Sequence, residues 1–281
     1  MNAVISSEQF MSEEASLAAE RREDPFADAK VMVEVNDITV AFRSYQERAT
    51  SIKETMIRLI RDHKIRYYST FDALSNVSFK VREGEIYGII GSNGSGKSTM
   101  LKVLAQVLKP TVGQVKIAGN VSSLIDLGLG FDSELNAIEN IYLNGSLHRK
   151  TSAEIKGRVD SILEFAELTE FAKTPIKYYS AGMNARLGFA VAIDINPDIL
   201  LVDEVLGVGD ERFQKKCAVV FKKFVESKKT IIIVSHDMSM LSLTAHRVGL
   251  LSRGKLIFDG DPKTAVELYR NVDYQTALGH G

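Results

Sequence analysis

Two kinds of hydrophobic pattern run along the chain, and they predict two kinds of strand. Residues 31–42 and 72–81 alternate apolar and polar positions, which is the period-two pattern of strands buried on one face. Residues 85–90, 199–202 and 230–234 are short, almost continuously apolar runs, as expected of parallel strands covered on both faces. The chain is therefore predicted to combine a small antiparallel β layer with a buried parallel sheet.

Helical patterns separate the buried strands. Apolar residues recur on one face of residues 99–108 and, at a spacing near 3.6, in residues 152–168. Residues 135–197 are helical in pattern almost throughout, and residues 246–260 predict a hairpin that turns at Ser252-Arg253-Gly254. We therefore predict an α/β fold with a parallel sheet, an N-terminal antiparallel β-subdomain and an inserted helical subdomain.

Composition limits the organisation of the chain. One domain is expected over 29–262, after an acidic flexible tail at 1–28 and before a short C-terminal helix and tail at 263–281. The formal net charge of −1 gives no support to nucleic-acid binding by the whole surface. Cys217 is the only cysteine, which excludes an intramolecular disulfide and favours a reducing, cytoplasmic setting. With no run of 18 apolar residues and no secretory signal, the chain is not expected to cross a membrane itself.

A glycine-rich segment follows the strand predicted at 85–90 and precedes the helix predicted at 99–108. It reads GSNGSGKST, in which the spacing G-x-x-x-x-G-K-[ST] lets backbone N–H groups and a helix N-terminus surround nucleotide phosphates. Lys97 is predicted to reach the β- and γ-phosphate oxygens, and Ser98 to offer its hydroxyl to Mg²⁺. The predicted phosphate-binding residues are Gly91, Ser92, Asn93, Gly94, Ser95, Gly96, Lys97, Ser98 and Thr99.

Polar residues end two of the buried strands, at the edge where open α/β sheets place their ligands. Asp203 follows 199–202 and is predicted to hold Mg²⁺, directly or through water. Glu204 is predicted to orient and deprotonate the attacking water. His236 follows 230–234 and is predicted to hydrogen-bond the γ-phosphate and that water. In isolation these would be ordinary surface residues, and it is the phosphate loop that favours a catalytic interpretation.

A small-residue turn starts the apolar helix predicted in KYYSAGMNARLGFAVA, residues 177–192. Together with the phosphate loop and the acidic strand end, this stretch resembles the nucleotide-binding subunits of ABC transporters, over about residues 31–262. The resemblance implies a P-loop NTPase core of the ABC ATPase fold. Tyr-Ser-Ala-Gly-Met at 179–183 is similar to the family's signature motif, Leu-Ser-Gly-Gly-Gln. The resemblance implies that Ser180, Ala181 and Gly182 face the γ-phosphate of ATP held by a second subunit. The plain alternative is a helix N-cap by Ser180.

The resemblance has consequences for assembly and for the base of the nucleotide. Because one phosphate loop and one signature turn cannot serve the same ATP, it implies a homodimer that encloses two nucleotides. Asp210 is expected at the seam of that dimer. The family also stacks an aromatic side chain on adenine; Phe42 is the first candidate here, with Tyr45 and Phe71 as alternatives.

One element of the family pattern is missing. A glutamine that links Mg²⁺ to the membrane subunit is usual in the region that corresponds to residues 122–145, which contain none. Asp126, Asp132 and Glu134 remain open as replacements.

The segment 43–71 is longer than the usual connection between the first two strands. Ser51 and Glu54 form a capping box, and residues 43–66 carry seven Lys or Arg against three acids, so a basic amphipathic helix is predicted. One interpretation is a helix packed on the domain with a solvated basic face. The other, slightly favoured by the local charge, is contact with anionic headgroups or with the membrane subunit.

This insert and the neighbouring motifs are similar to one branch of the family, the ATP-binding subunits of O-antigen, teichoic acid and capsular polysaccharide exporters. That resemblance implies an ATPase that uses ATP and Mg²⁺ and pairs with a polytopic membrane permease, which moves a lipid-linked glycan. Its expected location is peripheral, at the cytoplasmic face of the bacterial inner membrane. The alternatives are another exported cargo or, in a different class, a soluble ABC ATPase that acts on ribosomes or DNA.

Overall fold

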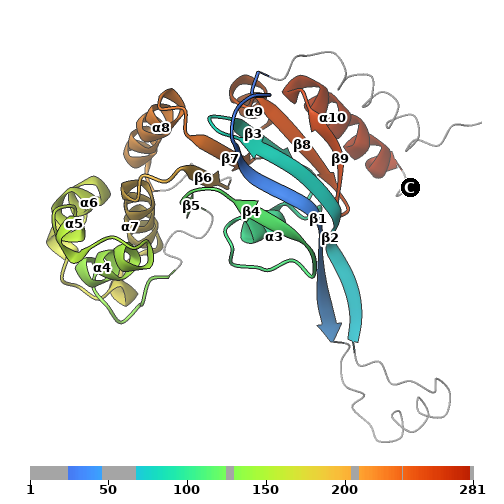
Figure 1. Cartoon of the computed structure of the whole chain (residues 1–281). Helices are drawn as coiled ribbons and strands as arrows, with labels where there is room; N and C mark the ends of the chain where they lie inside the picture. The colour runs from blue at the N-terminus through green and yellow to red at the C-terminus, as the bar shows by residue number, and fades with distance from the viewer. Residues whose placement is uncertain (1–24, 46–67, 125–129, 204–208, 236, 279–281) are drawn as a thin grey trace, which may run out of the picture.

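The computed structural model describes residues 25–45, 68–124, 130–203, 209–235 and 237–278. Within these ranges the chain forms two sheets with helices packed around them, as Figure 1 shows. One sheet is antiparallel and has three strands; the other is mostly parallel and has six. The predicted α/β fold class is confirmed.

The antiparallel sheet has the strand order β2-β1-β4. Its strands are β1 (Val31–Tyr45), β2 (Tyr68–Arg82) and β4 (Val112–Ile117). The prediction that residues 43–71 form a helical insert is wrong at both ends, because β1 and β2 continue into it and pair as far as Tyr45 with Tyr68. Aromatic cross-strand pairs such as Phe42 with Phe71 stabilise such an extension. The interior 46–67, with the predicted helix, lies outside the described residues.

The larger sheet has the strand order β5-β6-β7-β3-β8-β9. All of its neighbours run parallel except β9, which forms a hairpin with β8 as the sequence predicted. The strands are β3 (Ile86–Ile90), β5 (Val121–Ser123), β6 (Ile199–Val202), β7 (Thr230–Val234), β8 (Arg247–Ser252) and β9 (Lys255–Gly260).

Two cores explain why the parallel strands are apolar throughout. Along β7, Ile231 and Ile233 point into one core, while Ile232 and Val234 point into the other. The second of these cores lies between the two sheets and contains α3 (Lys97–Leu104). The opposite face is covered by α8 (Glu211–Glu226), α9 (Met238–Thr244) and α10 (Pro262–Leu278). The C-terminal helix is thus longer than the sequence predicted.

Four helices fall within residues 135–197, the range predicted to be helical, and have a core of their own. They are α4 (Ala137–Leu147), α5 (Ser152–Lys156), α6 (Val159–Ala166) and α7 (Ala181–Asp194), with 3₁₀ turns η1 (Thr169–Phe171) and η2 (Ile176–Tyr178). The single helix expected at 152–168 is divided at Gly157 between α5 and α6. Figure 1 shows α4, α5 and α6 to one side of the sheets.

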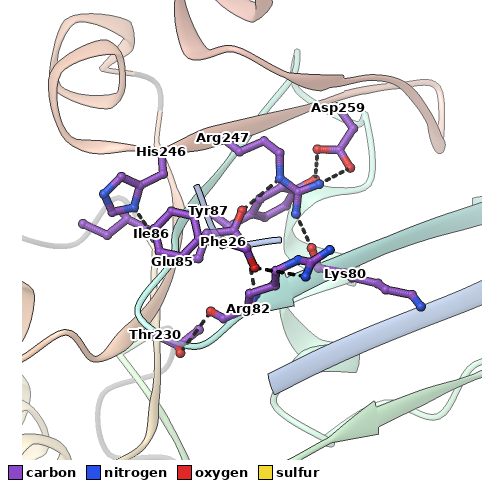
Figure 2. Close-up of polar contacts among 10 residues, drawn as sticks. All are labelled: Phe26, Lys80, Arg82, Glu85, Ile86, Tyr87, Thr230, His246, Arg247 and Asp259. Carbon is purple, nitrogen blue, oxygen red and sulfur yellow. Dashed lines mark hydrogen bonds and ion pairs between the residues drawn. The ribbon is translucent and has the colours of Figure 1, made fainter. Parts of the chain in front are cut away.

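A partly buried ionic network ties the two sheets together at the amino ends of the parallel strands (Figure 2). Arg247, at the start of β8, donates to the Glu85 carboxylate at 2.9 Å, to Asp259 of β9 at 2.9 Å and to the carbonyl of Lys80 in β2. Its guanidinium also lies 5.0 Å from the ring centroid of buried Tyr87. One side chain therefore links β8, β9 and the start of β3 to the antiparallel sheet.

Residues before β1 are attached at the same edge. The Arg82 guanidinium donates to the carbonyls of Phe26 and Ala27, and the Phe26 ring lies 4.9 Å from the ring of His246. His246 Nδ1 in turn accepts a hydrogen bond from the backbone N–H of Ile86 at 2.9 Å. The end of the predicted tail 1–28 is therefore folded onto the domain, whereas residues 1–24 lie outside the described residues.

In the part of the chain that the structure describes, the helices are too short or too polar to cross a bilayer.

Candidate nucleotide-binding site

The phosphate loop connects the central strand β3 to α3 and has a backbone that requires glycine. Gly91 and Gly96 have φ values of +154° and +108°, which side chains rarely allow. A Cβ at Gly91 would lie 2.2 Å from the carbonyl oxygen of Leu251, and one at Gly96 would lie 2.6 Å from that of Ala73. The loop is therefore held between β8 and β2, and this close packing fixes its shape.

The start of α3 is arranged to receive an anion. Gly96 is its N-cap and offers no side chain to the first backbone N–H groups of the helix. Lys97 is 7% exposed, and its Nζ donates to the carbonyls of Gly91 at 2.7 Å and Ser92 at 3.1 Å. The ammonium group is thus held over the loop whose N–H groups would surround a phosphate.

A cleft of about 660 Å³ opens beside this loop. It is large enough for a nucleoside triphosphate, and residues from both sheets line it. The lining residues that the sequence predicted are Phe42, Asn93, Gly94, Gly96, Lys97, Ser98, Thr99 and Asp203, with Phe71 among the alternatives. The remaining predicted loop residues, Gly91, Ser92 and Ser95, do not line the cleft, and Ser95 is buried.

Two aromatic rings form one wall of the cleft. Phe42 of β1 and Phe71 of β2 face each other across the strand pair, with ring centroids 5.7 Å apart and planes inclined by 30°. Both are exposed, Phe42 to 37% and Phe71 to 56%, although they are large and apolar. Exposed apolar surface of this kind is suited to stacking a base. Of the three candidates for that role, the side chain of Tyr45 lies outside those described.

Oxygen donors for a magnesium ion line the same cleft. Ser98, in the first turn of α3, and Asp203, directly after β6, present a hydroxyl and a carboxylate. Such hard oxygen donors fit Mg²⁺, which usually takes few protein ligands and completes its shell with phosphate and water. The described residues hold no cluster of three or more His, Cys, Asp or Glu side chains, so an all-protein metal site is not found among them.

The two predicted catalytic residues, Glu204 and His236, lie outside the described residues. Asp203, which precedes Glu204, and Val234, two residues before His236, both line the cleft. The candidate Asp126 is likewise outside the described residues. Asp132 accepts from the backbone N–H of Glu134 at 2.9 Å, and Glu134 pairs with Lys177 at 2.6 Å, so these two carboxylates make local contacts away from the cleft.

The signature turn lies on a different, exposed surface of the chain. Ser180 is the N-cap of α7, and its Oγ accepts from the backbone N–H of Met183 at 3.2 Å. Buried Tyr179 fixes the chain before it by donating to the carbonyl of Phe171 at 2.7 Å. A Cβ at Gly182 would meet little besides the Ser180 hydroxyl, 3.9 Å away. Neither Ser180, Ala181 nor Gly182 lines the phosphate cleft of its own chain.

Asp210 does not line the cleft either. Its Oδ1 accepts from the backbone N–H of Phe213 at 2.9 Å and caps the N-terminus of α8. In a single chain this residue has a structural function.

The chain is similar to known proteins in sequence and in fold. A family model described as ABC transporter matches residues 74–207. The O-antigen export system ATP-binding protein RfbB of Klebsiella pneumoniae is 39% identical over 241 residues, which are 86% of this chain and 98% of the relative. The chain belongs to the ABC transporter family.

A second relative is a longer protein, and a solved structure has a similar fold. The teichoic acids export ATP-binding protein TagH of Bacillus cereus is 39% identical over 85% of this chain, but the match spans 42% of TagH. Among solved structures, the ATP-binding cassette MJ0796 in a dimeric post-hydrolysis state bound to ADP and Pi is 25% identical, with a TM-score of 0.63. That match covers 82% of this chain and 99% of the cassette.

A second ionic network joins the signature helix of this ABC cassette to α8. The carboxylate of Glu167, which follows α6, is 3.2 Å from Arg186 of α7 and 2.6 Å from Lys216 of α8. Hydrogen bonding by Lys216 lowers the pKa of Glu167, and Arg212 lies 3.8 Å away. Beneath the network, Phe165, Phe189 and Phe213 pack ring against ring, with centroids 5.6–6.1 Å apart. The orientation of the signature helix therefore depends on contacts with the helix that Asp210 caps.

Sequence analysis missed five residues that line the cleft, namely Asp72, Ala73, Val234, Arg253 and Gly254. The first two follow Phe71 on β2, and in that part of the chain only Phe71 was considered, as an aromatic side chain that could stack on adenine. The last two were recognised as a hairpin turn, but no local pattern indicates that this turn packs against the phosphate loop.

Proposed function

We propose that this chain is the ATP-hydrolysing subunit of an ABC exporter that moves a lipid-linked polysaccharide, of the O-antigen, teichoic acid or capsule type, across the bacterial inner membrane. The observation that carries the ATPase proposal is the cleft in which the phosphate loop, Ser98 and Asp203 meet the ring of Phe42. The polysaccharide cargo is supported by the names of relatives that align with more than four fifths of this chain.

Each part of the cleft has a proposed task in binding. The backbone N–H groups of residues 91–96 and Lys97 bind the β- and γ-phosphates, and Phe42 stacks on adenine. Ser98 and Asp203 hold Mg²⁺, which supplies charge neutralisation at the phosphates when it is bound. These contacts orient the triphosphate with its γ-phosphate towards the ends of β6 and β7.

The reacting residues follow those strands in sequence. Glu204 is proposed to accept the proton of the attacking water, and His236 to donate a hydrogen bond to the γ-phosphate. Both roles require a water placed in line with the bond that breaks, because phosphoryl transfer depends chiefly on position and charge.

A homodimer is proposed because the signature turn lies apart from the cleft of its own chain. The hydroxyl of Ser180, the N–H of Gly182 and the N-terminus of α7 form a donor group suited to an anion. In the proposed dimer this group contacts the γ-phosphate bound by the partner subunit, and Asp210 lies at the seam. ATP then acts as a bridge between subunits, and its hydrolysis releases them.

The test compares Glu204→Gln with wild type. The variant should bind ATP, form a dimer in ATP and Mg²⁺ by size-exclusion chromatography, and hydrolyse ATP at least about a hundredfold more slowly, the scale expected for loss of a general base. Glu211→Gln, an exposed acid in the first turn of α8, is the control and should retain wild-type turnover. Wild-type turnover by the Glu204 variant would remove that residue from its role.

The membrane partner and cargo require a cellular test. The subunit should co-purify with a polytopic permease from membranes, and its loss should leave a lipid-linked glycan in the cytoplasmic leaflet. Deletion of 51–64 should spare ATP binding but abolish export if this segment contacts the permease. Normal export after that deletion would limit the segment to a packing role, and unchanged glycan export without the subunit would point to another cargo.

A further inference from the structure

The hairpin between β8 and β9 brings an arginine to the nucleotide cleft. Ser252 pairs with Lys255, so the turn consists of Arg253 and Gly254 alone. Arg253 is exposed, lines the cleft together with Phe42 and Lys97, and forms no ion pair among the residues that the structure describes. The cleft thus has a second cationic side chain besides the lysine of the phosphate loop.

The conformation of this turn favours asparagine or aspartate over arginine at its first position. Arg253 has φ of +46° and Gly254 has φ of +78°, as in a two-residue turn of the type that favours Asn-Gly or Asp-Gly. A left-handed backbone is unfavourable for a long side chain, whereas asparagine tolerates it well. Arg149 and Lys228 adopt the same conformation, so it is the place of Arg253 at the cleft that indicates a function for its guanidinium.

The turn is hydrogen-bonded to both the phosphate loop and β2. Gly254 donates its backbone N–H to the carbonyl of Ser95 in the phosphate loop at 2.9 Å, and its own carbonyl accepts from Ser75 of β2 at 2.8 Å. A Cβ at Gly254 would lie 2.9 Å from the carbonyl oxygen of Ala73, close to the aromatic wall. Arg253 therefore extends from a backbone that is held between β2 and the phosphate loop.

We propose that Arg253 binds the α-phosphate of the nucleotide. This inference deepens the proposed function and rests on it. A nucleotide whose base stacks on Phe42 and whose terminal phosphates lie over Lys97 presents its ribose and α-phosphate to the region between them. A guanidinium donates well to phosphate oxygens and stays charged at every relevant pH. The α-phosphate is common to ATP and ADP, and its charge does not change when the γ-phosphate is transferred.

The test uses Arg253→Asn in the 281-residue chain. Since asparagine suits the left-handed backbone, the variant should keep or raise the wild-type Tm while it loses the guanidinium. Calorimetric titration in EDTA, which suppresses hydrolysis, should show that the Kd values for ATP and ADP both rise about tenfold, the low end for a charge-assisted hydrogen bond at an exposed site. In Mg²⁺, KM should rise by a similar factor with kcat unchanged, because the contact is equal in the ground and transition states.

Two further variants make the outcome decisive. Arg253→Lys should recover part of the lost affinity, and Lys255→Ala, which removes an exposed cation two residues away outside the cleft, should bind as wild type. Wild-type affinity of Arg253→Asn for both nucleotides would overturn the inference, and so would a loss confined to ATP. Lys97→Ala, measured in parallel, separates failure of the Arg253 proposal from failure of the proposed nucleotide site. If Lys97→Ala also binds both nucleotides with wild-type affinity, the proposed nucleotide site itself is wrong.

Discussion

Removal of the Glu85 carboxylate should destabilise the domain strongly, because this charge is buried and has two specific partners. Its side chain is 3% exposed. One oxygen accepts from Arg247 at 2.9 Å, and the other accepts from the backbone N–H of Arg82 at 2.7 Å. Glu85→Ala leaves the Arg82 N–H without this acceptor and takes one anion from Arg247, which keeps Asp259 and the carbonyl of Lys80.

The magnitude follows from those contacts. A hydrogen bond between charged groups is worth about 1.5–3 kcal/mol, and a buried donor left unsatisfied costs about 1–3 kcal/mol. Because Arg247 retains two other acceptors, a total near the lower end is expected, about 3 kcal/mol. For a domain of this size such a loss lowers Tm by roughly 6–12 °C. Urea denaturation followed by circular dichroism, together with thermal melting, measures both quantities.

Glu34→Ala is the matched control. Glu34 also pairs with two cations, Lys80 at 2.9 Å and Lys116 at 3.1 Å, but those lysine side chains are 52% and 62% exposed. Ion pairs of this kind contribute little, because water already solvates both charges. The urea midpoint should therefore hardly move in Glu34→Ala. Equal losses in the two variants would refute the argument that burial decides the strength of the Arg247 network.

Three other predictions concern the signature helix, a histidine and the hairpin turn. Glu167→Gln should keep the ATP Kd but lower kcat several-fold, because its three cationic partners no longer fix α7 against α8; unchanged kcat in a coupled ATPase assay would contradict this. Partial burial lowers the pKa of His246 below its ordinary 6.5, and the neutral imidazole accepts a hydrogen bond from Ile86. This contribution to stability should be complete above pH 6.5 and be lost as the pH falls through the lowered pKa. Titration of the His246 ring by NMR should give a pKa below 6.5. Gly254→Ala should lower Tm, since a Cβ would lie 2.9 Å from the Ala73 oxygen and φ is +78°, and a wild-type Tm would mean that the turn can shift without cost.

The parts of the fold that sequence predicted well are those set by local pattern. The apolar runs at 199–202 and 230–234 form β6 and β7 within the same bounds, because full burial on both faces leaves no polar position in the run. The phosphate loop was predicted as a unit for a similar reason, since its glycines and Lys97 act within a few residues of one another.

Predictions failed where tertiary contacts decide. Residues 43–45 and 68–71 read as part of a polar, basic insert, yet they are strand because each pairs with the other across 22 intervening residues. The cleft residue Arg253 was equally hidden, since a hairpin turn in sequence carries no sign of what it packs against. Asp210 and Ser180 are N-caps in the single chain, and their predicted contacts with a second subunit and its nucleotide stay predictions.

The position of the cleft between two sheets has a mechanical consequence. Phe42 comes from the antiparallel sheet and Lys97 from the end of a parallel strand, so the distance between base and phosphate sites depends on how the sheets are docked. That docking relies on the shared core around α3 and, at the opposite edge, on Arg247, which bonds to groups from both sheets. The residues that line the cleft and the Arg247 network that stabilises the fold therefore lie at opposite ends of the parallel strands. A change at Glu85 that loosens the docking should weaken nucleotide binding even though it is remote from the cleft, whereas Glu34, which bridges strands within one sheet, should leave binding intact.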